Sequence, residues 1–397
     1  MRLIILDSGL KDNCGHNFLF AKLIAEEAGR RGLEVIALCH EDLPRGTLPL
    51  RRRPIFDSSY YYVINEEDPV ESPVASAKKL NASFYQTMSA LGPDAISRDD
   101  LVLVPSINQN NLGGLARWLR DLGPDRAPAV AIALLFTPGV STDGDAVHIY
   151  DSLRALQYRA TLGNFRGMRH VHLMGTGHQT AADHAYLAKG PVPPHPLLVD
   201  LPADVPAPEP RTLLLFAGNS AEGKGIRLLP EAVRLLAERM PDWTFLVQAN
   251  DTTNWAFKEP VEALRKLAPA LPQLELQTGF VDEAGYRTLF ARSAVVAIPY
   301  DATAYRYASS GILWEAIGAG RPMVIPKDTY LEREAAAWDA NYVAIDTATS
   351  ESLADGIAAA VASGVLDLHK AQRSAKAFRA RNGAAPFLDM VLKLRRT

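Results

Sequence analysis

The sequence predicts an α/β protein built from two doubly wound parallel sheets. Short apolar runs alternate with amphipathic stretches of helical period along nearly all of the chain, which is the pattern of strands covered by helices on both faces. A proline-bearing segment near the middle divides this pattern into two halves. With 397 residues, of which 48% are apolar and 22% charged, each half can bury a core of its own.

Five apolar runs of the first half are predicted strands, separated by helix-like stretches. They read RLIILD, EVIALC, LVLVP, AVAIALLF and HVHLM, of which the first spans Arg2 to Asp7. After it, DNCGHNFLFAKLIAEEAGRRGLEVIALC predicts a loop, an amphipathic helix and the second strand. The stretches PSINQNN (Pro105–Asn111) and TPGVSTDGD (Thr137–Asp145) follow strands, so they either line a ligand pocket or form solvent-exposed turns.

A linker is predicted between the halves. The segment PVPPHPLLVDLPADVPAPEP, residues 191–210, carries eight prolines, which deny it regular structure. Six more predicted strands follow, reading TLLLFAG, WTFLVQA, LELQT, AVVAIP, PMVIP and YVAI. Two further helical stretches are predicted at about residues 367–381 and 386–395. Ligands of doubly wound sheets bind beyond the carboxyl ends of the strands, so the expected site is a cleft between the two domains.

Charge and cysteine content limit the classes of partner. A net charge of -3 offers no polycationic surface, so a nucleic-acid polymer is not an expected partner. Cys14 and Cys39 are too few for a disulfide framework and lack metal-ligand spacing, which favours a reducing compartment such as the cytoplasm. No signal peptide or membrane-spanning run is expected. The run Arg51–Arg53 is interpreted as a solvated loop, with peripheral contact at the inner face of a membrane as the alternative.

A glycine-bearing turn in the second half is a candidate phosphate site. In LFAGNSAEGKGIRLLPEAVRLLAERM, Gly218 and Gly225 bracket a turn whose backbone can approach a diphosphate, and Lys224 supplies a positive charge beside the following helix. The turn matches neither the dinucleotide-binding fingerprint nor the P-loop pattern. We therefore expect another class of nucleotide-handling protein, although a lysine in this position can also be merely solvated.

A second candidate lies further along the chain. Ser309, Ser310 and Gly311 precede a predicted helix that carries Glu315, so free amides and hydroxyls at its start can meet a phosphate. Apolar residues surround Glu315 in the sequence, and a carboxylate in such company needs a polar partner. The alternative for Glu315 is an exposed position on the helix.

Three segments together resemble a known family. GNSAEGKG (218–225), QTGFVDEAGYRTLFARSAVVAIPY (277–300) and SSGILWEAIGAGRPMVI (309–325) resemble the donor-binding half of GT-B glycosyltransferases, especially family 4. The resemblance covers about residues 211–345. It implies two Rossmann-like domains facing each other across a cleft, with an acceptor domain at 1–200, a nucleotide-sugar donor domain at 201–375 and a last helix, 376–397, crossing back to the first domain.

The resemblance also implies roles for individual residues. Lys224 would be catalytic by neutralising the departing diphosphate, and Glu315 would accept hydrogen bonds from the ribose hydroxyls. His16, in the loop after the first strand, would be the base of an inverting enzyme, and an equal alternative is that it caps or packs the helix start. The residues implied in donor binding are Gly15, Gly218, Asn219, Lys224, Ser309, Ser310, Gly311 and Glu315.

Two positions depart from the family pattern. Tyr307 stands where many retaining members carry the first glutamate of a pair, and Asn219 stands where an arginine is common. These departures put a retaining course in doubt. They also keep open a binding module of the same fold that has lost turnover.

The resemblance implies a glycosyltransferase that moves a sugar from a nucleotide-diphosphate donor to a carbohydrate or lipid-linked acceptor, in surface polysaccharide biosynthesis. A nucleotide-sugar epimerase on the same architecture is the alternative enzyme. We expect no metal, since the chain has no D-x-D motif and GT-B enzymes generally do not need one, and no cofactor beyond the donor substrate.

Overall fold

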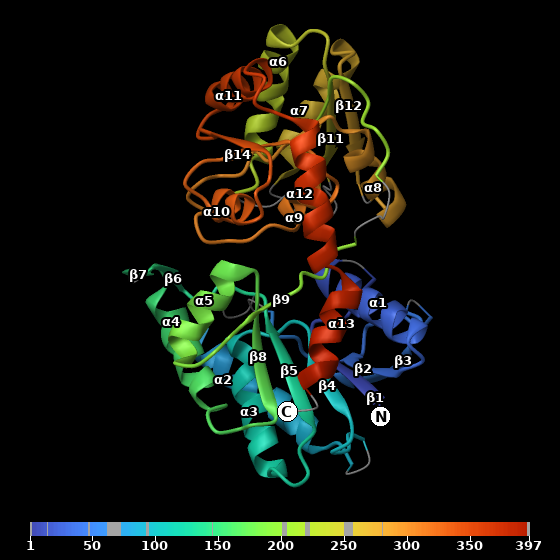
Figure 1. Ribbon diagram of the computed structural model, residues 1–397, viewed down its shortest axis with the longest axis vertical. Coiled ribbons are helices and arrows are strands. Elements are labelled where there is room, and N and C mark those ends of the chain that lie inside the picture. The colour runs from blue at the N-terminus through green and yellow to red at the C-terminus, as the bar shows by residue number, and fades with distance from the viewer. Residues whose placement is uncertain are drawn as a thin grey trace. The chain divides into compact units, whose positions relative to one another are not determined.

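The computed structural model describes residues 2–394 except residues 14, 47, 62–72, 93–94, 145, 201–204, 219–222, 250–256 and 280. The chain divides into two compact units, whose elements are labelled in Figure 1. Unit 1 comprises residues 1–198 and 382–397, and unit 2 comprises residues 199–381.

Unit 1 contains a parallel sheet in the order β3-β2-β1-β4-β5-β8-β9. Each of the five apolar runs predicted in this half is one of its strands. The strands are β1 (Arg2–Asp7), β2 (Glu34–His40), β3 (Arg51–Phe56), β4 (Leu101–Val104), β5 (Ala129–Leu134), β8 (Val171–Thr176) and β9 (Pro194–His195). The strand order reverses between the neighbouring strands β1 and β4, so the loops that follow them leave the carboxyl edge of the sheet side by side.

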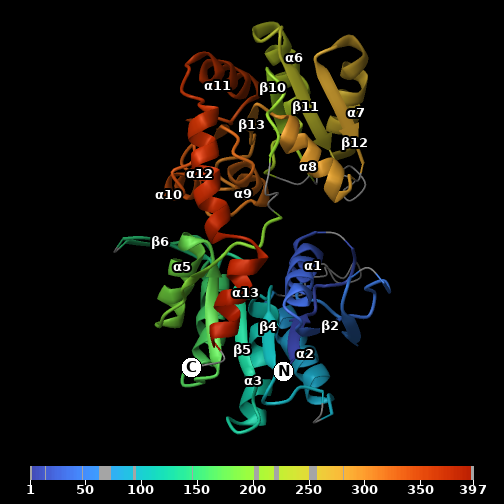
Figure 2. The same ribbon diagram turned by 45° about the vertical axis from the view of Figure 1, so that its right-hand side comes forward.

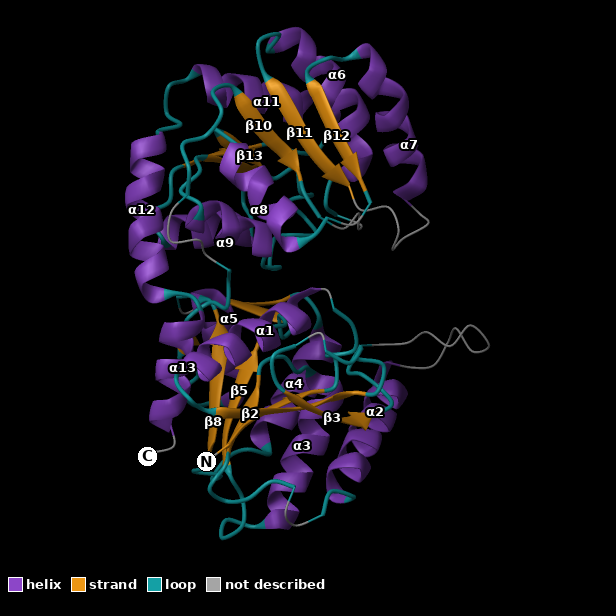
Figure 3. Cartoon of the chain, turned by 90° about the vertical axis from the view of Figure 1, so that its right-hand side faces the viewer, coloured by secondary structure: helices purple, strands orange, loops and turns teal. Residues whose placement is uncertain are grey.

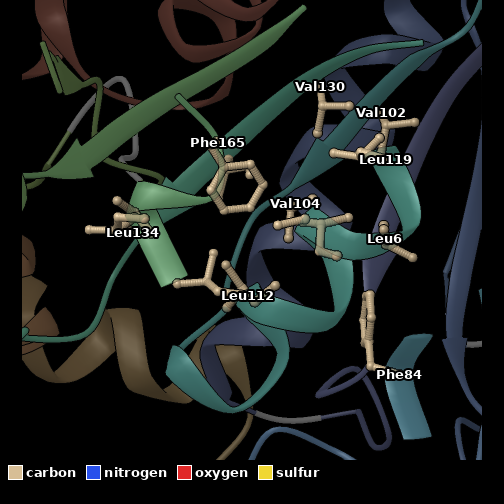
Figure 4. Packing of buried hydrophobic residues seen from close by; sticks show 14 of the residues in the cluster. Leu6, Phe84, Val102, Val104, Leu112, Leu119, Val130, Leu134 and Phe165 are labelled. Carbon is tan, nitrogen blue, oxygen red and sulfur yellow. The ribbon is translucent and has the colours of Figure 1, made fainter. Parts of the chain in front are cut away.

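Helices cover both faces of this sheet. They are α1 (Gly15–Arg30), α2 (Pro73–Ser89), α3 (Gln109–Leu122), α4 (Ser152–Gly163), α5 (His178–Ala188) and α13 (Ala384–Lys393). Alternate residues of β1 enter different cores: Leu3 and Ile5 pack with α1 and α13, whereas Ile4 and Leu6 pack with α2, α3 and α4. Figures 1 and 2 both place α13 beside α1, and Figure 4 shows the second core, with Leu6 among its members.

Both faces of β1 are therefore buried. This is why the strand appears in the sequence as an uninterrupted apolar run rather than as an alternation of apolar and polar residues.

Three elements of unit 1 differ from the prediction. Arg51–Arg53 belong to β3, an edge strand, so their interpretation as a loop was wrong. The exposed Arg51 and Arg53 protect this edge from pairing with other chains. The stretch predicted as a loop at 137–145 contributes β6 (Val140–Asp143), which pairs antiparallel with β7 (Ala146–Ile149). Part of the proline-rich linker, Pro194–His195, adds β9 at the opposite edge.

The proline-rich segment can join the sheet because an edge strand needs only one side of its backbone. The amide of Gly175 donates to the carbonyl of Pro193 at 3.0 Å, and a proline carbonyl accepts as well as any other.

Unit 2 contains a second parallel sheet, in the order β12-β11-β10-β13-β14-β15, and Figure 3 shows several of its strands side by side. Its strands are β10 (Thr212–Phe216), β11 (Thr244–Ala249), β12 (Leu274–Thr278), β13 (Val295–Ala297), β14 (Met323–Pro326) and β15 (Tyr342–Ile345). The two parallel sheets confirm the predicted α/β class. In this sheet the strand order reverses between the neighbouring strands β10 and β13.

The helices of unit 2 begin with a 3-10 turn, η1, and include a second one, η3. They are η1 (Ile226–Leu228), α6 (Leu229–Arg239), α7 (Lys258–Leu267), η3 (Ala268–Ala270), α8 (Glu283–Arg292), α9 (Gly311–Gly318), α10 (Tyr330–Ala337), α11 (Ser350–Ala362) and α12 (Leu368–Arg381). Leu213 and Leu215 of β10 pack into one core with α6, α7 and α11. Loops at the carboxyl ends of β10 and β13 are thereby fixed on a rigid base.

Candidate functional site

The turn after β10 is held against the loop after β13 by two glycines. Gly223 and Gly225 have φ angles of +78° and +76°, which glycine adopts without strain. A Cβ atom at position 225 would lie 1.8 Å from the carbonyl oxygen of Pro299, and one at position 223 would lie 2.6 Å from the Cβ of Ala304. The Gly223 carbonyl also accepts a 2.7 Å bond from the amide of Asp301. Only glycine permits this close approach of the two loops.

Lys224 stands between these glycines and is half-buried. Its ammonium group lies 6.0 Å from the centre of the Tyr300 ring, a distance at which the ring face attracts a cation. Burial lowers the pKa of Lys224, and the charge of Glu315 raises it in part. One detail differs from the prediction: the first turn after Lys224 is η1, and the α-helix begins only at Leu229.

Gln248, at the end of β11, ties three strand ends together. Its Oε1 accepts a 2.6 Å bond from the amide of Gly218, and its Nε2 donates a 2.9 Å bond to the carbonyl of Gly279. Only 3% of its surface is exposed, so both bonds are protected from water. Gly218, with φ at +108°, is thus fixed at the start of the turn that leads to Lys224.

The N-terminus of α9 lies on the same edge of the sheet. Ser310 is the N-cap residue, but its side chain makes no capping bond to the helix; the hydroxyl instead donates to the Tyr300 hydroxyl at 3.5 Å. The amides that begin at Gly311 therefore have no side-chain cap, which is the arrangement in which a helix start binds an anion. Ser309, the residue before the cap, is half-buried.

Glu315 lies in the second turn of α9 and is electrostatically coupled to Lys224. Burial raises the pKa of Glu315 to about 7; a hydrogen bond from Tyr286 and the charge of Lys224 oppose this rise, and the charge of Asp200 adds to it. The Oε2 atom is buried and makes no hydrogen bond within the parts of the chain that the structure describes. A buried carboxylate oxygen without a donor is costly, so this atom is suited to a hydroxyl of a ligand.

Other predicted residues have different outcomes. Asn219 lies outside the described residues. Tyr307 is half-buried on the loop after β13, where Arg306 lies 5.9 Å from its ring. Lys224, Ser310, Gly311 and Glu315 all belong to unit 2 and to the same end of its sheet.

Gly15 and His16 belong to unit 1, in the first turn of α1. Gly15 is exposed with φ at +72°, and nothing lies within 4 Å of the place a Cβ would occupy. The imidazole of His16 is half-buried in an aromatic enclosure, with ring centres at 5.8 Å from Phe20, 6.5 Å from Tyr61 and 6.1 Å from Phe136. Burial lowers the pKa of His16 to about 4, so the ring is neutral at physiological pH.

His16 sits at the edge of a buried polar network. Its Nε2 lies 3.2 Å from the Tyr61 hydroxyl and 3.5 Å from the Ser106 hydroxyl. Ser106, which follows β4, lies 2.8 Å from the hydroxyl of Tyr60. Both hydroxyl partners of Nε2 come from loops at the carboxyl edge of the sheet, the position at which doubly wound folds hold their ligands.

Asp7 anchors this network at the end of β1. Its carboxylate accepts bonds from the side-chain amide of Asn17, at 3.1 and 2.9 Å, and from the backbone amide of Gly9 at 2.8 Å. Asn17 also donates to Tyr60 at 2.5 Å and accepts from Tyr61 at 3.2 Å. Burial raises the pKa of Asp7 to about 6, and the hydrogen bonds limit the rise.

Several residues of these sites were missed by sequence reasoning. Gln248 had a signal, since it is one polar residue inside the apolar run TFLVQA. Asp7 and Ser106 also had a sequence signal, because Asp7 is the polar last residue of an apolar strand and Ser106 is a polar residue shortly after another. Tyr61 and Tyr286 had none, since only the folded chain brings them to His16 and Glu315.

The described residues also bear on metal binding and on membrane insertion. Among them, no three His, Cys, Asp or Glu side chains gather as a metal site requires, and the absence of a metal stays a prediction. None of the helices in the described ranges has the length and apolar character needed to cross a membrane.

The chain matches no protein-family model and no curated protein sequence. It is similar to solved structures over its whole length. One is trehalose-6-phosphate from E. coli bound with UDP-2-fluoro glucose, with 12% identity, a TM-score of 0.66 and coverage of 100% of this chain and 99% of that one. Sucrose-phosphate synthase from Thermosynechococcus elongatus has 14% identity, the same TM-score and the same coverage.

A third is WaaG, a glycosyltransferase involved in lipopolysaccharide biosynthesis, with 14% identity, a TM-score of 0.61 and coverage of 99% of each chain. At these identities the likeness establishes the fold. The chain has the two-sheet GT-B fold of glycosyltransferases.

Proposed function

We propose that this protein is a glycosyltransferase that moves a sugar from a nucleotide-diphosphate donor to a hydroxyl of a carbohydrate or lipid-linked acceptor. The observation that carries the proposal is the electrostatic interaction of Lys224 with Glu315 in unit 2. A half-buried cation that interacts electrostatically with a carboxylate, one of whose oxygens is buried without a donor among the described residues, suits a ligand that presents both an anion and hydroxyl groups. A nucleoside diphosphate has both, in its diphosphate and its ribose.

In this proposal unit 2 binds the donor. The Lys224 ammonium and the uncapped amides at Gly311 contact the diphosphate, and the Ser310 hydroxyl adds a donor. Glu315 accepts hydrogen bonds from the ribose hydroxyls. Because negative charge accumulates on the diphosphate as the glycosidic bond breaks, Lys224 and the helix amides stabilise the transition state more than the ground state.

Unit 1 supplies the acceptor side in the same proposal. His16 is neutral at physiological pH, which is the protonation state of a base that removes a proton from the acceptor hydroxyl. This role belongs to an inverting course. A product that keeps the anomeric configuration of the donor would remove His16 from the chemistry and leave it as a packing or acceptor-contact residue.

Family 4 membership, a role in surface polysaccharide assembly and a cytoplasmic location remain part of the proposal. Their support is the set of motifs at residues 218–225, 277–300 and 309–325, together with the likeness in fold to WaaG. The exposed side chains of Arg51 and Arg53 on β3 support transient contact with an anionic membrane surface.

The donor site is tested by binding of uridine diphosphate, measured by titration calorimetry. Lys224→Ala and Glu315→Ala should each weaken binding by about 1.5–3 kcal/mol, the scale of a hydrogen bond to a charged group. Lys327→Ala and Glu238→Ala are matched controls on the surface of unit 2 and should bind like the wild type. Wild-type affinity in both site variants would refute the donor site.

Turnover is tested by release of uridine diphosphate from a panel of nucleotide sugars. Release that depends on an added carbohydrate acceptor supports transfer. Conversion of the donor to another nucleotide sugar without release would identify an epimerase. Binding without either reaction across the panel would identify a module that has lost turnover.

A further inference from the structure

Within the buried network of unit 1, Asp7 determines the direction of the hydrogen bonds that lead through Asn17 and Tyr61 to His16. When it is ionised, the carboxylate of Asp7 can accept hydrogen bonds but cannot donate one. Both of its oxygens lie within 3.1 Å of one nitrogen of the Asn17 side chain. Turning the Asn17 amide round would place its oxygen against this carboxylate. Asp7 therefore fixes the amide with its nitrogen inward, and Asn17 is itself buried.

The fixed amide determines where the Tyr61 proton goes. The Oδ1 atom of Asn17 points away from Asp7 and has the Tyr61 hydroxyl as its donor at 3.2 Å. That hydroxyl has one proton and also lies 3.2 Å from Nε2 of His16. If the proton went to Nε2, the buried carbonyl of Asn17 would have no donor. Placing a proton on Nε2 itself satisfies both bonds, because Nε2–H then donates to the Tyr61 oxygen. If the Ser106 hydroxyl donated to a bare Nε2 instead, across 3.5 Å, the lone pairs of Nε2 and of the Tyr61 oxygen would face each other across the shorter 3.2 Å contact.

We propose that Asp7 is a positioning residue that, through Asn17 and Tyr61, keeps the proton of His16 on Nε2 and leaves the lone pair of Nδ1 for the acceptor hydroxyl. The catalytic part of this inference rests on the proposed function. The proton placement does not, since it is inferred from the hydrogen-bond partners of Asn17 and Tyr61. Nδ1 makes no hydrogen bond with any residue in the described ranges, which leaves it available to a ligand.

Asp7→Asn is the substitution that reverses the arrangement. An asparagine at position 7 keeps the oxygen bonded to the Gly9 amide but places an NH₂ group 2.9 Å from the nitrogen of Asn17. The bond from Asn17 to the remaining oxygen, at 3.1 Å, then competes with this clash of two NH₂ groups, and turning Asn17 so that its oxygen faces position 7 and its NH₂ faces Tyr61 relieves the clash. The Tyr61 proton moves to Nε2, and the proton of His16 moves to Nδ1.

The proton position is read by long-range ¹H–¹⁵N NMR of the full chain with ¹⁵N-labelled histidine, and His16→Gln assigns the signals. Wild type should show His16 protonated on Nε2. Asp7→Asn should reverse this, and Tyr61→Phe, which removes only one oxygen, should give a mixture of the two tautomers. Asp100→Asn changes another buried carboxylate of unit 1, paired with Arg2, and should leave His16 unchanged.

Two results would overturn the inference: a wild-type proton on Nδ1, or a wild-type tautomer in both Asp7→Asn and Tyr61→Phe. In a transfer assay, Asp7→Asn should lower kcat about tenfold with donor affinity intact, the change that one hydrogen bond supplies. The expected tautomers combined with no transfer activity would instead refute the proposed function, so the two failures are distinguishable.

Discussion

If Glu315 binds the ribose hydroxyls, the affinity for a nucleotide diphosphate should fall steeply below neutral pH. Burial raises the pKa of Glu315 from 4.5 to about 7, against the opposing effects of Tyr286 and Lys224. Ribose hydroxyls that donate to this group require its ionised form. The carboxyl is mainly ionised at about pH 8, whereas only about 3% is ionised at about pH 5.5. The measured dissociation constant should therefore rise about 30-fold between these values, or about 2 kcal/mol.

The assay needs a reference because uridine diphosphate also titrates in this range. Glu315→Gln keeps the shape of the side chain and removes its ionisation, so the ratio of dissociation constants between variant and wild type isolates Glu315. Lys224 has the opposite effect on binding, since acid increases its protonation and thereby favours the diphosphate anion. Both proteins contain Lys224, so its effect cancels in the ratio. Calorimetry of both proteins at both pH values gives the ratio.

The expected ratio shrinks about 30-fold from alkaline to acid conditions, because only the wild type has a carboxylate to lose. Parallel pH dependence in the two proteins would show that Glu315 either does not meet the ribose or does not titrate near neutrality. Either result refutes the reasoning that connects its buried oxygen to the ligand.

Two further predictions concern the framework of unit 2. Gly225→Ala should lower the midpoint of thermal unfolding and weaken uridine diphosphate binding, because the added Cβ would collide with the Pro299 carbonyl. The control is Gly364→Ala, at a position with a similar φ of +70° and open space around it. This control should show only the backbone strain of about 1–2 kcal/mol. Equal effects would contradict the collision. The buried Arg321 donates from Nε to the carbonyl of Phe290 and from Nη2 to two further carbonyls, at 2.8–2.9 Å. Arg321→Ala should therefore lower the free energy of unfolding, measured in urea, by about 3 kcal/mol or more, and Arg321→Lys should lower it by less. An unchanged urea midpoint would contradict this.

The parallel strands were predictable because their burial has a direct sequence signal. β1 was predicted with its observed bounds, Arg2–Asp7, since a strand buried on both faces must be apolar throughout. β3 had no such signal: RRRPIF joins the sheet through backbone bonds to β2, and three arginines on an edge strand resemble a solvated loop. β9 is similar, with a partner supplied only by β8. Edge strands depend on the rest of the fold and are the ones that sequence patterns miss.

The candidate donor residues were predictable for a different reason. Lys224 and Glu315 stand in motifs whose order and spacing resemble a known family, and the structure places them at the same end of one sheet. Tyr286 and Asp200, which set the electrostatics of Glu315, lie 29 and 115 residues from it in the chain and carry no motif. Their positions depend on how α8 and the segment before β10 pack, which no local pattern records.

Asp7 shows what the network of unit 1 demands of the fold. Its pKa is raised from 3.8 to about 6, so the folded state binds its proton more tightly than the unfolded chain does. The stability that this group contributes is fully present below about pH 3.8 and is lost as the pH rises through about 6, a difference of about 3 kcal/mol at neutral pH. A neutral residue at position 7 would avoid this loss. An ionised carboxylate is the group that forces the nitrogen of Asn17 inward, and through Tyr61 it sets the proton on His16. The energetic disadvantage at the end of β1 therefore accompanies a defined proton arrangement at the first turn of α1, which an apolar core at this edge of the sheet could not provide.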